Sequence, residues 1–175
     1  HLKTLPALAQ SWSEETPLLY RVQLRDDTFW SNGTALKAQD FIRAWKSLLS
    51  NSKNAFNVSL LFSVKNAKAY FEKKGDFSDV GIKALSHNTL QIEFEKKTKE
   101  PLSIFSHPAL FPVFSSSIPG ALPSIGPFYV VSRQPGVSLQ LKENPYYWNK
   151  DRSGIREIVL SIISDPKMRL ALFED

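Results

Sequence analysis

The fold is decided by residues 18–50, which read LLYRVQLRDDTFWSNGTALKAQDFIRAWKSLLS. In residues 18–25 apolar and polar side chains alternate, which is the period of a strand with one buried face. Ser31-Asn32-Gly33 then indicates a turn, because Asn and Gly both tolerate the positive φ that tight turns need. The first half of this stretch therefore predicts a half-buried strand followed by a tight turn.

The second half of the same stretch predicts a helix over residues 38–50. Its apolar residues recur at helical spacing and form one stripe. They are Phe41, Ile42, Trp45, Leu48 and Leu49. The start of the helix is weakly capped, because Lys37 stands where Ser or Thr would serve best, although Asp40 suits the positive end of the helix dipole. We therefore expect an amphipathic helix with a poor N-cap.

Further elements follow along the chain, and they mix helices with strands. The predicted set is a helix at 57–74, a hairpin at 82–94, a short helix at 102–105, strands at 128–132, 137–141 and 158–162, and a helix that starts at Asp165-Pro166. Five prolines between residues 101 and 123 exclude a long helix there. Together these elements predict a mixed α+β fold.

Composition excludes several classes of protein. The 175 residues carry a net charge of +5, with 22% charged residues, and contain no cysteine. A chain without cysteine has no disulfide framework, zinc–thiolate site or thiol nucleophile. Basic and acidic residues are mixed, as where Lys96-Lys97 follows Glu95, so we expect solvated faces and no nucleic-acid partner. No apolar run has the length of a membrane-spanning helix.

The sequence contains no recognisable catalytic motif. His1, His87 and His107 have no partner at metal-ligand spacing. A phosphate-binding loop, a dinucleotide-binding turn and a nucleophile elbow are all absent. The paired carboxylates Glu14-Glu15 are expected in a solvated turn. We therefore expect a protein that is not an enzyme and that needs no cofactor.

Short phrases spread over the chain carry a family resemblance. In order they are PALAQSW (6–12), YRVQLR (20–25), FWSNGT (29–34), AQDFIRAW (38–45), GIKALSHNTL (81–90), HPALFPV (107–113), GPFY (126–129) and LKENPYYW (141–148). In content and order they resemble the family 5 extracellular solute-binding proteins, the oligopeptide- and dipeptide-binding components of ABC importers. The resemblance covers essentially the whole chain.

The resemblance implies a periplasmic-binding-protein-like fold of type II, as in the oligopeptide-binding proteins, which have three lobes. Residues 1–124 would form the small second lobe, and residues 125–175 a truncated part of the first lobe with strands and the start of a helix. Lys37 replaces the usual Thr cap of the family, which should weaken that helix start by about 1 kcal/mol. The family's third lobe holds the peptide N-terminus, so this piece alone should bind peptide poorly or not at all.

The resemblance also implies a function. It points to a non-catalytic receptor that closes on oligopeptides by hinge motion and delivers them to the permease subunits of an ABC transporter. Such a protein would be a monomer, either periplasmic or anchored as a lipoprotein on the outer face of the cytoplasmic membrane. His107 and Phe111 are the candidate ligand-binding residues. Two alternatives keep the fold: a sensor domain of a transcription regulator, and a relative that binds nickel complexes or haem.

Overall fold

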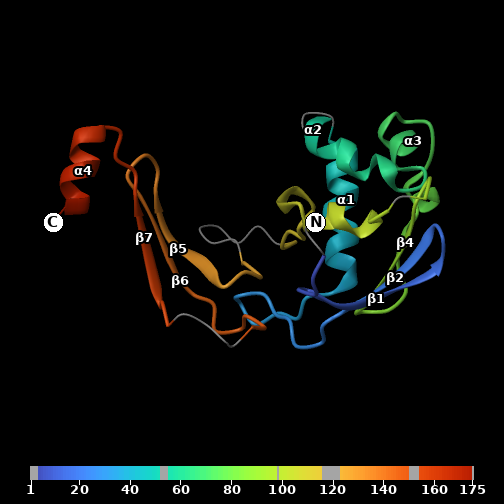
Figure 1. Cartoon of the computed structure of the whole chain (residues 1–175), viewed down its shortest axis with the longest axis horizontal. Coiled ribbons are helices and arrows are strands. Elements are labelled where there is room, and N and C mark those ends of the chain that lie inside the picture. The colour runs from blue at the N-terminus through green and yellow to red at the C-terminus, as the bar shows by residue number, and fades with distance from the viewer. Residues whose placement is uncertain (1–3, 52–54, 98, 116–122, 150–153, 175) are drawn as a thin grey trace. The chain divides into compact units, whose positions relative to one another are not determined.

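The computed structural model describes residues 4–51, 55–97, 99–115, 123–149 and 154–174 (Figure 1). The chain forms two compact units. Unit 1 comprises His1–Asp26 and Leu36–Ser115, and unit 2 comprises Asp27–Ala35 and Ser116–Asp175. Each unit is therefore assembled from two separate stretches of the sequence. The assignment of residues 1–124 and 125–175 to two lobes of a larger fold stays a prediction.

Unit 1 contains a four-stranded antiparallel sheet. Its strands are β1 (Ala9–Thr16), β2 (Leu19–Leu24), β3 (Ile82–Ala84) and β4 (Thr89–Glu93), in the spatial order β1-β2-β4-β3. The structure confirms the predicted strand at 18–25 as β2 and the predicted hairpin as β3 and β4. Tyr20, Val22 and Leu24 are buried, as the two-residue period of a strand requires.

The edge strand β1 is not predicted by the sequence pattern. Most of its side chains are polar and exposed, so it lacks the alternation that reveals β2. Glu14-Glu15 lie in this strand, and the expected solvated turn is therefore wrong. The Tyr20 hydroxyl donates to Glu14 Oε2 at 3.0 Å, and Arg21 Nη2 donates to Glu15 Oε2 at 3.3 Å. These contacts between side chains add to the backbone pairing of β1 with β2.

Helix α1 (Ala38–Ser50) confirms the predicted helix, and Figure 1 shows it beside the sheet of unit 1. Its buried side chains include Phe41, Ile42, Trp45 and Leu49. The weak cap is confirmed as well, because the Lys37 side chain makes no capping hydrogen bond. Instead, the Lys37 backbone N–H donates to Asp40 Oδ2 at 2.8 Å. One orphan donor at the helix start is thus satisfied by the acid predicted to suit the dipole.

The predicted helix at 57–74 is wrong. The structure has three short helices in its place: α2 (Ala55–Val58), the 3₁₀ helix η2 (Ser59–Ser63) and α3 (Ala67–Phe71). The apolar residues of this region recur at helical spacing, and that spacing suggested a single amphipathic helix. The break between η2 and α3 shows why the spacing was misleading.

Two residues interrupt the helical path after η2. Val64 has an extended backbone and forms an isolated antiparallel bridge with Phe94. Asn66 then adopts the left-handed conformation, with φ 57°, which Asn tolerates better than most residues. Leu61, Val64 and Ala67 are all buried, although no common helix positions them. Pairing with the sheet therefore outweighs local helix propensity at this point.

Gly81 lies where three backbone segments of unit 1 meet. Its N–H donates to the Lys65 carbonyl at 2.9 Å, and its carbonyl accepts from the Glu93 N–H at 2.7 Å. A Cβ at this position would lie 2.5 Å from the Glu93 carbonyl oxygen and 2.9 Å from Lys65 Cβ. Glycine is required here because there is no room for a side chain.

Unit 2 contains a three-stranded antiparallel sheet followed by a helix. Its elements are β5 (Phe128–Gln134), β6 (Ser138–Glu143), β7 (Glu157–Ser161) and α4 (Pro166–Glu174), with the strands in the order β5-β6-β7. All four elements were predicted and are confirmed. Asp165 Oδ1 accepts from the Lys167 N–H at 2.8 Å, which is the predicted N-cap of the last helix.

Residues 27–35 belong to unit 2 although they precede α1 in the sequence. The Ser31 N–H donates to the Ser124 carbonyl at 2.8 Å, and the Ser124 N–H donates to Ser31 Oγ at 3.1 Å. Gly33 has φ 81°, which confirms the predicted turn, and the Tyr146 ring packs against its Cα face. The turn is thus held by segments about a hundred residues further along the chain.

Buried apolar side chains are concentrated in unit 1. Among the described residues, Trp30 is the single hydrophobic core side chain that belongs to unit 2. Unit 2 has a larger set of exposed large apolar side chains. They are Val137, Tyr146, Ile155, Val159, Leu160, Ile162, Met168, Leu170 and Phe173. Unit 2 therefore has little core of its own and presents much of its apolar surface to solvent.

Candidate functional site

Both predicted ligand-facing residues lie in one loop of unit 1. The 3₁₀ helix η4 (Pro101–Ser106) precedes this loop. The loop itself contains the 3₁₀ helix η5 (Pro108–Leu110), and an extended segment follows. Each helix begins with proline, which suits the first helical position because its missing N–H would have no partner there. The predicted short helix at 102–105 is confirmed in 3₁₀ form. We refer to residues 107–113 as the 107–113 loop.

His107 caps the second 3₁₀ helix of this loop. Its Nδ1 accepts a hydrogen bond from the Ala109 N–H at 3.2 Å, and its own backbone is extended. Because Nδ1 accepts, the donor of the neutral ring is Nε2. The ring is exposed, so this N–H is in a position to bond to a ligand acceptor. The ligand contact itself stays a prediction.

Trp45 of α1 anchors the loop to the core. The indole Nε1–H donates to the Leu110 carbonyl at 2.8 Å in a buried hydrogen bond between residues 65 positions apart. The Trp45 ring also packs on the Phe105 ring, with their centroids 4.8 Å apart. Leu110 itself is 1% exposed. The loop backbone is therefore fixed to the helix at a defined point.

The 107–113 loop alternates buried and exposed side chains. Leu110 and Pro112 are buried, whereas Phe111 is 45% exposed and Val113 is 59% exposed. Apart from His107, the exposed side chains of the loop are apolar, and the loop carries no formal charge at neutral pH when His107 is neutral. The structure thus brings the two predicted residues into one anchored loop that presents an apolar surface to solvent.

The remaining histidines do not form a site. His87 follows β3 in the hairpin turn, where its Nε2 lies 3.7 Å from Asp26 Oδ1 and both side chains are largely exposed. This agrees with the predicted solvated turn. His1 lies outside the described residues. In the described ranges, no group of three or more metal-ligating side chains could hold a metal ion, and no helix is long and apolar enough to cross a membrane.

Two ionisable side chains have shifted pKa values. Burial, together with the hydrogen bond to the Glu14 carboxylate, raises the pKa of Tyr20. The hydrogen bond from Lys74 lowers the pKa of Glu72, which is an exposed side chain. Both shifts come from structural pairs on the surface or sheet, and neither group lies beside a nucleophile. The shift at Tyr20 therefore links the stability of the sheet to pH.

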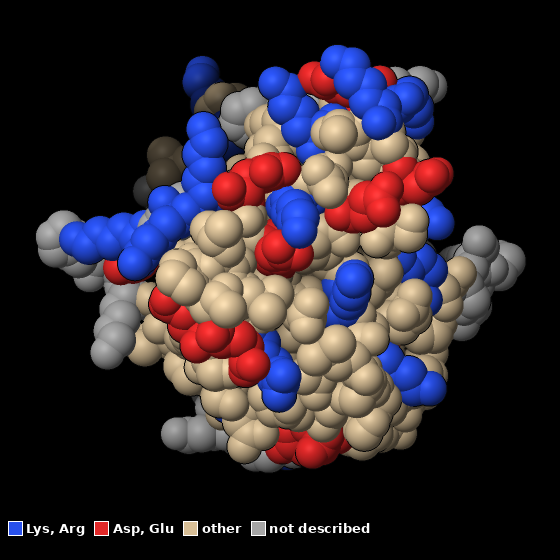
Figure 2. Space-filling view, turned by 90° about the vertical axis from the view of Figure 1, so that its right-hand side faces the viewer, with Lys and Arg blue, Asp and Glu red and all other residues tan. Residues whose placement is uncertain are grey.

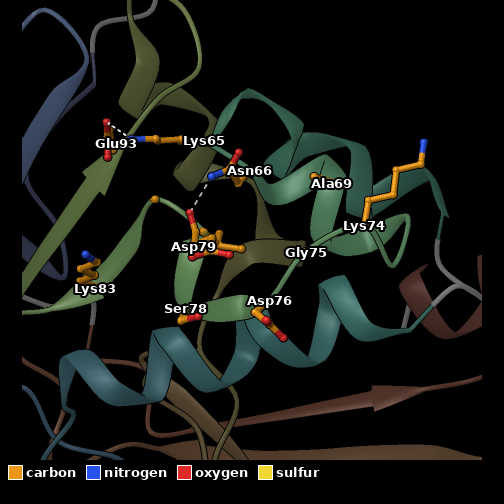
Figure 3. A pocket seen from close by; sticks show the side chains of 12 residues that line it. Lys65, Asn66, Ala69, Lys74, Gly75, Asp76, Ser78, Asp79, Lys83 and Glu93 are labelled. Carbon is orange, nitrogen blue, oxygen red and sulfur yellow. Dashed lines mark hydrogen bonds and ion pairs between the residues drawn. The ribbon is translucent and has the colours of Figure 1, made fainter.

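A polar hollow lies between α3, the 3₁₀ turn at Phe77–Asp79 and the β3–β4 hairpin, with a volume of about 390 Å³ (Figure 3). Lys65 Nζ donates to Glu93 Oε1 at 2.7 Å on one wall, and Asn66 Nδ2 donates to the Asp79 carbonyl at 2.9 Å. In Figure 3 the Lys74 side chain extends away from the other labelled residues. Sequence reasoning missed this hollow because its lining comes from separated segments without a motif.

Charge on the surface of unit 1 is mixed. Lys and Arg side chains are interspersed with Asp and Glu on the face that Figure 2 shows. The ion pairs include Lys65 with Glu93 at 2.7 Å and Lys74 with Glu72 at 2.7 Å. On this face the pattern is that of solvated, partly paired charges, as the sequence predicted, and a continuous basic stripe for nucleic acid is not seen.

Comparison with known proteins gives consistent matches. The model of the bacterial extracellular solute-binding proteins, family 5 (middle region), matches residues 3–175. The chain is 29% identical to the dipeptide-binding protein DppE of Bacillus subtilis over 97% of its length, and 27% identical to the oligopeptide-binding protein OppA of the same organism over 89%.

Solved structures agree with these matches. The substrate-binding domain of an oligopeptide ABC transporter from Bacillus anthracis has a TM-score of 0.86 and 28% identity over 97% of this chain. OppA of Burkholderia pseudomallei has a TM-score of 0.82 and 27% identity, also over 97%. The chain spans about a third of each of these relatives, for example 33% of DppE and 35% of the B. anthracis protein.

Proposed function

Because the chain belongs to the bacterial extracellular solute-binding proteins of family 5, we propose that it is part of a non-catalytic receptor that binds oligopeptides for import. The observation that carries this proposal is the family match over residues 3–175. Relatives named for oligopeptide and dipeptide binding, together with the fold shared with OppA structures, support the choice of peptide as ligand.

Peptide recognition in this proposal relies mainly on the ligand backbone. Main-chain hydrogen bonds give affinity that does not depend on peptide sequence, and side-chain pockets then set the preference. In unit 1 the 107–113 loop is the best candidate contact surface. The exposed Nε2–H of His107 is a donor for a peptide carbonyl, and the half-exposed Phe111 is an apolar contact.

The cellular role follows from the same family membership. We infer that the full-length protein works outside the cytoplasmic membrane, either free in the periplasm or anchored as a lipoprotein. It would bind peptide as a monomer and pass it to the permease subunits of an ABC transporter. The extracellular location of the family and the periplasmic and transport roles for which its members are named support this inference.

Calorimetry of the full-length protein with short peptides tests the proposal. We expect saturable binding of several unrelated peptides, because backbone hydrogen bonds are common to all of them. Nickel and haem are titrated in parallel, because the alternative function is that of a relative that binds nickel complexes or haem. Clear heat with nickel or haem, and none with any peptide, would show that the ligand class is wrong. Hydrolysis of the peptides during the titration would overturn the non-catalytic assignment.

A further inference from the structure

Residues 101–132 form a run of 32 residues without Asp, Glu, Lys or Arg, in a chain in which charged residues make up 22%. The 107–113 loop lies inside this run. A charged ligand group placed against the 107–113 loop would lose hydration, and the loop itself offers no acidic or basic side chain other than His107 to compensate it. The composition of this segment therefore favours an uncharged occupant and disfavours a charged one.

Beyond His107, the exposed part of the loop at Phe111 and Val113 is apolar as well as uncharged. Phe111 has an extended backbone, with φ −68° and ψ 146°, so successive side chains point to alternate sides. Leu110 and Pro112 are buried, and Phe111 and Val113 are left facing solvent. Two apolar side chains on one exposed strip can make van der Waals contact with an apolar side chain of a ligand.

A chain of aromatic rings supports the loop from within. It joins β2, the segment after β4, η4 and α1 through rings whose centroids lie 4.8 to 6.5 Å apart. In order the rings are Tyr20, Phe94, Phe105, Trp45 and Phe41. Within this chain Trp45 has a second role, because its indole N–H bonds to the Leu110 carbonyl at 2.8 Å.

This hydrogen bond holds the loop backbone at Leu110 in the absence of any ligand. The bond is buried, and without the indole the Leu110 carbonyl would lack this partner. The residue that it fixes directly precedes Phe111. A loop already held in one conformation loses less entropy when it binds, which improves affinity without adding a contact.

We propose that the 107–113 loop is a preformed, uncharged surface that accepts apolar side chains of a bound peptide, and that Trp45 positions this surface. The proposal rests on the peptide-binding function proposed above. Phe111 and Val113 are the specificity-determining residues in it, and Trp45 is a positioning residue that touches no ligand.

Selectivity is tested with short alanine peptides that carry Phe, Glu or Lys at one position at a time. With the full-length protein we expect one position at which Phe binds more tightly than Glu and Lys. Phe111→Ala should reduce this preference about fivefold, the effect of losing part of one aromatic contact. Leu85→Ala is the matched control, because Leu85 is 48% exposed on the same unit and Phe111 is 45% exposed.

Positioning is tested with Trp45→Phe, which keeps a ring in the aromatic chain and removes the N–H donor. We expect peptide affinity to fall by up to about fivefold, because the loop can then leave its binding conformation, and the hydrogen bond that favours this conformation is worth about 1 kcal/mol. Phe41→Leu is the control, since Phe41 packs on Trp45 but makes no bond to the loop. It should lower the melting temperature and leave peptide affinity unchanged. Should Trp45→Phe fail to fold, hydrogen exchange of the Trp45 indole N–H in the wild-type protein replaces it, and we expect slower exchange with peptide bound.

The outcomes separate the proposal from the function on which it rests. Peptides that bind equally whether they carry Phe, Glu or Lys would overturn the uncharged surface while leaving peptide binding intact. Equal loss of affinity in Trp45→Phe and Phe41→Leu, or indole exchange that peptide does not change, would overturn the positioning role. Failure of the wild-type protein to bind any peptide would overturn the proposed function, and this inference with it.

Discussion

Tyr20 illustrates how a single side chain couples the sheet of unit 1 to pH. Its ring is buried and packs edge-on against Phe94, with centroids 5.7 Å apart, while its hydroxyl reaches the exposed edge strand and donates to Glu14. The phenol must stay neutral to keep this arrangement, because a buried phenolate beside a carboxylate would be desolvated and repelled. Burial and Glu14 accordingly raise its pKa above the usual value.

Stability should therefore fall in alkali. With a raised pKa in the folded state, the contribution of Tyr20 is complete below the ordinary tyrosine pKa of 10.0 and is lost as the pH rises above it. Tyr20→Phe cannot ionise and should flatten this decline by up to about 1.4 kcal/mol per pH unit. Urea unfolding at several alkaline pH values measures how the free energy of unfolding declines with pH. Glu14→Gln is the control and should show a decline of intermediate steepness; identical curves for wild type and Tyr20→Phe would refute the assignment.

Gly81 offers a sharper test at the same scale. Gly81→Ala places a methyl group 2.5 Å from the Glu93 carbonyl oxygen, so the backbone has to shift. We expect a loss of about 1–3 kcal/mol in the free energy of unfolding. Gly75→Ala is the matched control, because nothing lies within 4 Å of a Cβ there, and it should change stability by less than about 1 kcal/mol. Equal effects of the two substitutions would contradict the crowding at Gly81.

At the scale of the element, helix α1 carries a cap that the sequence itself marks as poor. Lys37 has φ −125° and ψ 153°, the extended conformation in which Ser or Thr caps a helix. Lys37→Thr should stabilise the protein by about 1 kcal/mol, since its hydroxyl can accept from a free N–H of the first turn. Lys37→Ala removes the charge without adding a cap. If both variants raise the free energy of unfolding equally, the stabilisation comes from loss of the Lys37 charge and the capping explanation is wrong.

The elements that sequence patterns predicted are those in which one local signal dominates. Strand β2 alternates cleanly, and α1 has a full apolar stripe. The region at 57–74 failed because its decisive interactions are distant: Val64 pairs with Phe94, and Asn66 N–H donates to Glu95 Oε1 at 2.6 Å. No local pattern contains those partners.

The candidate site also has features that the sequence could predict and features that it could not. His107 and Phe111 were predicted through the resemblance of one phrase, and the structure places both in a single anchored loop. The hydrogen bond from Trp45 could not be predicted, because its partner lies 65 positions away and is a backbone carbonyl, which every residue has. The exposure of the Val113 side chain could not be predicted either, because an apolar residue type does not show whether that residue is buried or exposed.

At the scale of the whole chain, the two units differ in how well their apolar side chains are buried. Unit 1 has nearly all of the described core, whereas β7 and α4 of unit 2 expose Val159, Leu160 and Phe173 among others. In the 175-residue chain we expect slow hydrogen exchange in β2 and β4 and fast exchange in β7. An apolar dye should bind this chain strongly. Uniform protection across both units would show that unit 2 has more support than the described residues provide.

Peptide binding should also depend on chain length. The chain spans about a third of its relatives, for example 33% of DppE, and the family resemblance implies that the peptide N-terminus is held outside this region. Calorimetry should therefore detect peptide binding by the full-length protein, and weak binding or none by residues 1–175. Equal affinity of the two forms would mean that this piece contains the complete site.

The interleaved units impose an order on folding. Residues 27–35 emerge early, yet Ser31 hydrogen-bonds to Ser124, a partner 93 positions later in the sequence. Unit 1 ends at Ser115, so all of its residues are made before Ser124 is available to Ser31. At a synthesis rate of about 5–20 residues per second, the 93 positions from Ser31 to Ser124 take roughly 5–20 seconds to make. During that interval the Ser31 N–H and hydroxyl lack the partners that Ser124 provides in the folded chain.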